Sequence, residues 1–175
     1  MWKIVLIVVA ALVGGVLVVA AMRPDTFSVQ RSASIEAPAE KIYPMLIDFR
    51  QWPAWSPWEK LDPEMKRTLT GPTSGPGATY AWEGSSKVGS GRMEIKEVTA
   101  PGQVRIQLDF IKPFEGHNVI DFTLVPRGDT TEVTWLMRGP APFVSKLMGV
   151  FVDMDKMIGK DFEAGLANLK AAAEK

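Results

Sequence analysis

Residues 103–111 read Gln-Val-Arg-Ile-Gln-Leu-Asp-Phe-Ile, and this stretch decides the fold class. Apolar and polar side chains alternate along it, which is typical of a β-strand with one buried and one solvated face. The buried face is expected to hold Val104, Ile106, Leu108 and Phe110, and the solvated face Arg105, Gln107 and Asp109. A sheet with one apolar face must cover that face with another element.

The same period of two continues on both sides of this strand, between turns rich in Gly and Pro. It predicts further strands near residues 65–70, 77–83, 90–98, 117–126 and 130–138. An earlier stretch, residues 27–35, also alternates, and only Arg31 breaks its apolar side. Because the turns recur at hairpin spacing, we expect one antiparallel meander.

Two helices are predicted on either side of the later strands. Ala37-Pro38-Ala39-Glu40 begins a short helix through Ile47, which Pro44 should kink or shorten. The loop at residues 51–58 holds two prolines, and no regular element is expected there. Apolar residues three or four apart predict one long helix over residues 147–169, to cover the sheet. Its apolar stripe is Leu147, Phe151, Met154, Ile158, Phe162, Leu166 and Leu169.

Residues 4–22 form a separate apolar segment with no charge and no proline. As a helix it would be roughly 28 Å long, close to the thickness of a bilayer's hydrocarbon core. Trp2 and Lys3 stand before it and Arg23 after it, as expected for residues at a membrane interface. The alternative is a signal peptide cleaved after Val19-Ala20-Ala21, but the apolar run exceeds the roughly 7–15 residues of a usual signal.

The chain therefore divides into an anchor with a linker, residues 1–25, and one domain, residues 26–175. Lys3 and the α-amino group precede the span, whereas Arg23 and Arg31 follow it. The resulting slight bias favours a cytoplasmic N-terminus. We expect a single-pass protein, and in a bacterium this places the domain on the periplasmic side of the inner membrane.

Composition excludes several classes of function. The chain has 20 basic and 20 acidic residues, so it has no basic face with which to bind nucleic acid. It has no cysteine, which excludes disulfides and thiolate chemistry, and one histidine, His117, which excludes a His-rich metal centre. No phosphate-binding glycine motif is present. We expect no metal and no cofactor, and the oligomeric state is left open.

Several segments together resemble the START/Bet v 1-like (SRPBCC) superfamily, in its polyketide cyclase/dehydrase branch. The resemblance covers about residues 26–170. It rests on Arg31 through Tyr43, on Asp48 with Trp52, Trp55 and Trp58, and on residues 75–82, 131–135 and 161–166. It implies an α+β helix-grip fold, a curved antiparallel sheet of about seven strands wrapped around a long C-terminal helix. Members of this superfamily include lipid carriers, hormone receptors and cyclases.

The first functional hypothesis is a membrane-tethered domain that binds a hydrophobic small molecule or lipid between sheet and helix. Trp52, Trp55 and Trp58 would form the rim of the pocket, or would instead anchor their loop to the core. Methionines of the covering helix would suit varied apolar shapes. The candidate ligand-binding residues are Trp52, Trp55, Trp58, Tyr80, Trp82, Met93, Ile95, Ile106, Leu108, Phe110, Phe122, Trp135, Phe151, Met154, Ile158 and Phe162.

Two alternatives use the same features. A cyclase or dehydratase would use His117, Tyr80 and Arg92 as its first candidate residues, although no nucleophile–base set is evident. A protein-interaction domain would dock a membrane partner through the tryptophan loop.

The remaining charged residues are expected to be structural or solvated. His117 lacks an evident partner and suits a strand edge, while Asp109 and Asp121 are expected to be solvated on outward faces. Glu83 and Arg92 are expected to pair across a hairpin. The charges of the last helix, Asp161 among them, are expected on its solvated side.

Overall fold

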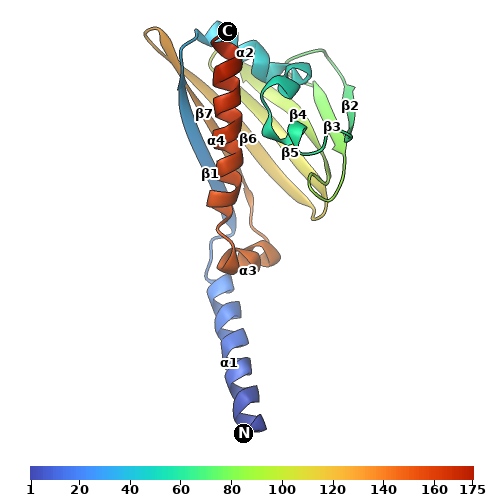
Figure 1. Ribbon diagram of the computed structural model, residues 1–175, viewed down its shortest axis with the longest axis vertical. Helices are drawn as coiled ribbons and strands as arrows, with labels where there is room; N and C mark the ends of the chain where they lie inside the picture. The colour runs from blue at the N-terminus through green and yellow to red at the C-terminus, as the bar shows by residue number, and fades with distance from the viewer.

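The computed structural model describes residues 1–175, and its central feature is one seven-stranded antiparallel sheet (Figure 1). The strand order is β1-β7-β6-β5-β4-β3-β2, so the first strand of the chain pairs with the last. The predicted strands and the α+β helix-grip class are confirmed, with shifts of one or two residues at strand ends. The strands are β1 (Thr26–Ile35), β2 (Lys66–Thr70), β3 (Thr79–Glu83), β4 (Ser90–Thr99), β5 (Gln103–Lys112), β6 (Gly116–Arg127) and β7 (Thr130–Pro140).

The register places the predicted apolar faces on one side of the sheet. In β5, Ile106 lies opposite Ile120 of β6, and Val104 lies opposite Phe122. All four side chains are buried. A shift of one residue would turn these side chains to solvent, so the alternation itself fixes the pairing.

The segment between β1 and β2 is more regular than the sequence indicates. Helix α2 (Ala39–Ile47) is followed by two short 3₁₀ helices, η1 (Phe49–Ala54) and η2 (Pro57–Lys60). The expectation that two prolines forbid any regular element here was wrong. Pro57 occupies the first position of η2, where a backbone N–H would have no hydrogen-bond acceptor within the helix, so its absence costs nothing. Pro44 lies inside α2, which ends three residues later.

The covering helix is two helices, not one. Helix α3 (Phe143–Phe151) has Val152 as its C-cap, and α4 (Met154–Ala173) is a separate helix. The Asp153 carboxylate accepts a hydrogen bond of 3.1 Å from the Lys156 amide and caps α4. Only α4 lies along the concave face of the sheet (Figure 1). The apolar period continued through the break, which is why the sequence predicted a single helix.

Arg31, which interrupts the apolar side of β1, faces α4. Its guanidinium binds Asp155 at 3.0 Å and Glu163 at 2.8 Å. A Cβ at Gly159 would displace this guanidinium, so the glycine allows Arg31 to lie close against the helix. Both carboxylates are more than half exposed, so the ion pairs position α4 more than they stabilise it.

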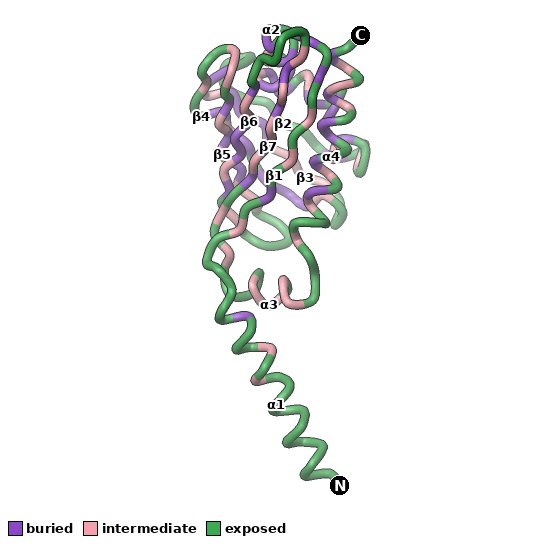
Figure 2. The backbone as a smooth tube through the Cα atoms, turned by 90° about the vertical axis from the view of Figure 1, so that its left-hand side faces the viewer, coloured by how far each residue is buried: buried purple, intermediate pink, exposed green.

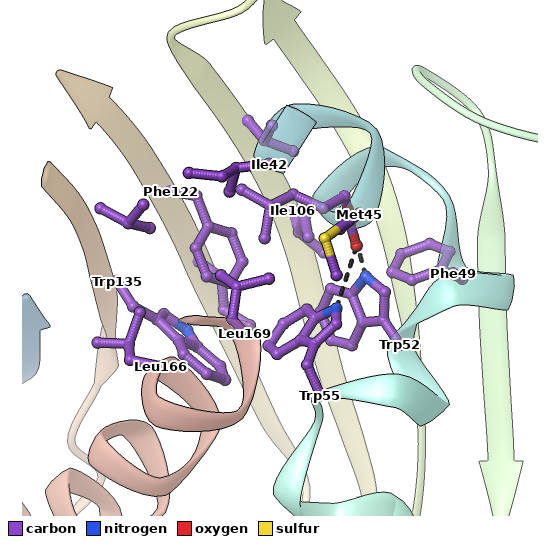
Figure 3. Close-up of a cluster of buried hydrophobic side chains, with 14 of the residues drawn as sticks. Ile42, Met45, Phe49, Trp52, Trp55, Ile106, Phe122, Trp135, Leu166 and Leu169 are labelled. Atoms are coloured by element: carbon purple, nitrogen blue, oxygen red, sulfur yellow. Dashed lines mark hydrogen bonds between the residues drawn. The ribbon is translucent and has the colours of Figure 1, made fainter. Parts of the chain in front are cut away.

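A cluster of buried hydrophobic side chains lies where α2, η1 and the C-terminal half of α4 meet the sheet (Figure 3). Trp135 stacks on Phe162 with 4.2 Å between ring centroids, and Trp55 packs edge-on against Trp135. Gly165 admits this contact, because a Cβ there would lie 2.8 Å from Trp135 Cζ3. The C-terminal half of α4 therefore closes this end of the domain.

Helix α1 (Trp2–Ala21) extends away from the domain, and its side chains are almost all exposed (Figure 2). It is the one helix that is long and apolar enough to cross a membrane, a criterion that a signal sequence also meets. Its C-terminal end packs against α3.

Candidate functional site

A cavity of about 980 Å³ lies between the sheet and the N-terminal half of α4. Strands β3 to β7 form its floor, and η2 and α4 form its walls. At its outer end it is bordered by the β3–β4 turn, the β5–β6 turn and the segment that leads into α3. Most of the side chains on the wall are apolar, so the cavity suits an apolar or amphipathic molecule.

The structure brings eleven of the sixteen candidate ligand-binding residues to this cavity and places five elsewhere. Four of the five are fully buried in the core, where α2 and the C-terminal half of α4 close over the sheet. The fifth, Phe151, belongs to α3, does not border the cavity and is 73% exposed. The eleven are Trp52, Trp58, Tyr80, Trp82, Met93, Leu108, Phe110, Trp135, Met154, Ile158 and Phe162. The four are Trp55, Ile95, Ile106 and Phe122.

The tryptophan loop is anchored to the core. The Trp52 indole donates a hydrogen bond of 3.2 Å to the Leu46 carbonyl, and the Trp55 indole donates one of 3.1 Å to the Met45 carbonyl (Figure 3). These bonds satisfy two carbonyls near the end of α2. Trp58 is half-buried and packs edge-on against Trp135. The loop is therefore a fixed wall of the cavity.

A buried polar cluster on the cavity wall escaped the sequence analysis. Glu59 of η2 is 8% exposed, accepts a hydrogen bond of 2.6 Å from the Tyr80 hydroxyl and pairs with Arg67 Nε at 2.6 Å. Burial, with the hydrogen bond to Glu59, raises the pKa of Tyr80 well above its usual range. A glutamate in a Pro-rich loop looks solvated in sequence, and only the fold shows that Tyr80 and Arg67 converge on it.

Two further polar side chains face the cavity without a partner in the protein. Asn118 of β6 is 6% exposed, shares the inward face with Ile120, and its carboxamide makes no side-chain hydrogen bond. Asp161 of α4 also lines the cavity, and burial raises the pKa of its carboxyl. Asp161 was expected on the solvated side of the last helix; it is only partly exposed, because it lies on the side of α4 that borders the cavity.

His117 lies at the outer rim of the cavity and has the partner that the sequence did not reveal. Its Nδ1 lies 2.8 Å from Asp109 Oδ1, directly across the β5–β6 hairpin. The hydrogen bond to Asp109 raises the pKa of His117. The His117 side chain is 61% exposed and lies at the rim of the cavity, whereas Asp109 does not border the cavity.

The outer face of the sheet corrects two other expectations. Asp121 is buried, not solvated, because Arg105 at 2.7 Å and Arg138 at 2.9 Å cover its carboxylate. Arg92 pairs with Glu94 at 3.1 Å and not with Glu83. The register explains this, since Arg92 lies opposite Ala81 while Glu83 lies opposite Ser90. Arg92 does not border the cavity.

The comparisons with known proteins agree with this geometry. A family model described as polyketide cyclase/dehydrase and lipid transport matches residues 26–174. The search of curated proteins finds no match.

Solved structures of low sequence identity share the fold. A protein from Chromobacterium violaceum has 14% identity and a TM-score of 0.61, over 87% of this chain and 99% of that chain. The Aha1 dimer from Colwellia psychrerythraea has 18% identity and a TM-score of 0.60, over 85% and 96%. The di-domain ARO/CYC protein BexL, from the BE-7585A biosynthetic pathway, has 14% identity and a TM-score of 0.60, over 90% and 53%. The family match covers nearly all of the domain, and the chain belongs to the polyketide cyclase/dehydrase and lipid transport family.

Proposed function

We propose that this protein binds a hydrophobic small molecule or lipid in the cavity, while α1 holds the domain at a membrane. The cavity carries the proposal. Its volume of about 980 Å³ lies at the upper end of the range for ligand pockets, roughly 300–1,000 Å³. Side chains that could have filled it, such as Leu108 and Met137, leave it open although each is itself buried.

The polar side chains of the wall indicate that the ligand is amphipathic. The Asn118 carboxamide lines the cavity and has no side-chain hydrogen bond within the protein, so a ligand could form one to it. Asp161 would accept a hydrogen bond from a hydroxyl or amine on the same ligand. Apolar groups would then pack against Met93, Leu108 and Ile158.

A membrane tether fits such a ligand. Helix α1 has 20 residues, or roughly 30 Å, and one flank carries Lys3 and the other Arg23. An anchored cavity would stay close to a source of amphipathic molecules. Since the first cations precede the span, we place the N-terminus in the cytoplasm and, in a bacterial cell, the domain in the periplasm.

Ligand binding is tested with the full chain purified in detergent and then delipidated. Native mass spectrometry, and titration with a fluorescent fatty-acid probe, should show one molecule bound per cavity. Leu108→Trp fills the cavity from its floor and should weaken probe binding at least tenfold. Val125→Trp, at an exposed position near the end of β6, is the matched control and should leave binding unchanged. Equal binding by both variants, each folded by circular dichroism, would overturn the proposal.

A second candidate function is a cyclase or dehydratase, and one observation favours it. The Glu59–Tyr80 pair places a buried carboxylate and a phenol at the wall of an apolar cavity, where positioned polar groups are effective. Of the three expected residues, Tyr80 and His117 border this cavity and Arg92 does not. A cyclisation assay with the bound ligand, once it is identified, would decide between binding and turnover. Loss of turnover in Tyr80→Phe or His117→Ala, with binding retained, would favour the enzyme.

The interaction-domain alternative loses its main support. Trp55 is fully buried and hydrogen-bonded to the end of α2, so it cannot present a surface to a partner.

A further inference from the structure

Helix α3 is an exposed apolar helix, which is unusual for an element in contact with water. Its nine residues include one charge, Lys146, whose amine pairs with Asp25 and is only 10% exposed. None of the nine side chains is buried. The exposed apolar residues of α3 and its C-cap are Phe143, Val144, Met148, Phe151 and Val152.

The position of α3 is set by the end of α1. Ala20, in the last turn of α1, is fully buried, although the rest of that helix is exposed. A Cβ at Gly149 of α3 would lie 3.1 Å from the Arg23 guanidinium, so the two helices meet where the chain leaves α1. The Ala141 amide donates a hydrogen bond of 2.7 Å to the Asp25 carbonyl and fixes the start of α3 beside the linker. If α1 spans a bilayer, α3 therefore lies at its surface.

The same end of the domain carries the mouth of the cavity. Ser145 of α3 and Pro142, just before it, border the cavity, as does exposed Met157 in the first turn of α4. Phe114, at the tip of the β5–β6 turn, is also exposed and borders the cavity. Figures 1 and 2 show α3 between α1 and the open end of the sheet. Exposed apolar side chains thus lie at the entrance on the side that faces the anchor, together with the charged side chains of Lys87, Lys112 and Glu115.

We propose that α3 lies in the headgroup region of the bilayer spanned by α1, so that the cavity opens directly onto the lipid surface. This inference rests on the proposed anchoring by α1. The occupant of the apolar face is a lipid bilayer, because α3 is continuous with the helix that would cross one. Lys146, the one cation of α3, is already paired, so apolar insertion drives the contact that α3 itself makes. An amphipathic ligand would then enter from the membrane without crossing water.

The chain has no cysteine, so single labels report each position without background. The full chain is reconstituted in phosphatidylcholine vesicles, with a fluorescent label at Val9→Cys in α1, Phe151→Cys in α3, or Asp129→Cys in the β6–β7 turn. That turn lies at the opposite end of β7 from α3. Lipids with a quencher high on the acyl chain should reduce the emission of the label at 151 at least twofold and leave the label at 129 unchanged. Lipids with a deep quencher should reduce the emission of the label at 9.

The outcomes separate this inference from the anchoring on which it rests. An unquenched label at 9 would refute the anchor itself. A quenched label at 9 with a water-exposed label at 151, accessible to iodide, would refute the docking of α3 alone. A label at 151 that is shielded from iodide but not quenched by lipid would indicate a protein partner or a second copy, and would also overturn the proposal.

A functional readout uses transfer of a fluorescent lipid from vesicles into the cavity. Phe151→Glu combined with Val144→Glu should slow transfer at least tenfold, while binding of a detergent-dispersed probe stays unchanged. Val125→Glu is the control for an added surface carboxylate and should not slow transfer. Equal transfer rates in the double variant and the parent chain would refute a lipid-facing entrance.

Discussion

The two halves of α4 should lose very different amounts of stability when a large aliphatic side chain is removed. Leu166 is 2% exposed and packs where the helix closes on the sheet, whereas Ile158 is half-buried and borders the cavity. Leu166→Ala removes three carbon groups worth about 0.8 kcal/mol each, and the void left behind raises the cost to about 3 kcal/mol. Ile158→Ala only enlarges an existing space, so we expect a loss below about 1 kcal/mol.

Thermal unfolding of the full chain in detergent, followed by circular dichroism, measures this difference. For a domain of this size, about 3 kcal/mol lowers Tm by roughly 6–12 °C, and the Ile158 variant should stay within about 4 °C of the parent. Probe binding should show the reverse order, because only Ile158 contacts the ligand. If both variants lose the same stability, side chains fill the space beside Ile158 and the reasoning about the cavity fails.

Three further outcomes are expected. Gly91→Ala would drive a methyl group into the Trp82 indole, and we expect a loss of at least about 2 kcal/mol in denaturant unfolding; an unchanged midpoint would contradict this packing. Tyr80→Phe removes a hydrogen bond to a buried carboxylate and should cost about 1.5–3 kcal/mol in the same assay, whereas a neutral effect would mean that the carboxylate is hydrated. Asp109 raises the pKa of the one histidine, His117, so the pair stabilises the fold fully below about pH 6.5 and loses this contribution as pH rises through the raised pKa. NMR titration should show a lower pKa of His117 in Asp109→Asn, and an unchanged value would refute the pairing.

The sheet could be predicted from sequence because apolar residues that alternate with charged ones fit only a β-strand with one buried and one solvated face. In β5, Arg105 and Asp109 cannot share a face with Ile106 without burying a charge, so the pattern determines both the element and its orientation. Arg31 is a charged residue on the apolar side of β1, and the structure explains why this position tolerates it. The edge strand leaves space for Arg31 to reach Asp155 and Glu163 on α4.

The polar part of the site could not be predicted in this way. Glu59 and Asn118 are single polar residues among apolar neighbours, and a sequence does not distinguish a buried polar residue from a solvated one. Glu59 is buried because Arg67, from a strand eight residues later, reaches back to pair with it. Asn118 occupies the space above Gly139 on the neighbouring strand, a contact that depends on the β6–β7 register.

The break at Val152 and Asp153 connects the failed helix prediction to the function. A single helix through residues 147–169 would have aligned Phe151 with Ile158 and laid both against the sheet. Asp153 prevents a continuous helix, because its backbone is extended and its carboxylate caps the start of α4. The apolar residues before it are thereby released from the sheet and held instead against the end of α1. A stripe with the period of a core helix thus supplies two surfaces, one that lines the cavity and one that faces the anchor. Both surfaces consist of the same types of apolar residue. The position of the capping Asp153 determines that the residues before it lie in α3, near the anchor, and that those after it lie in α4, over the cavity and the sheet.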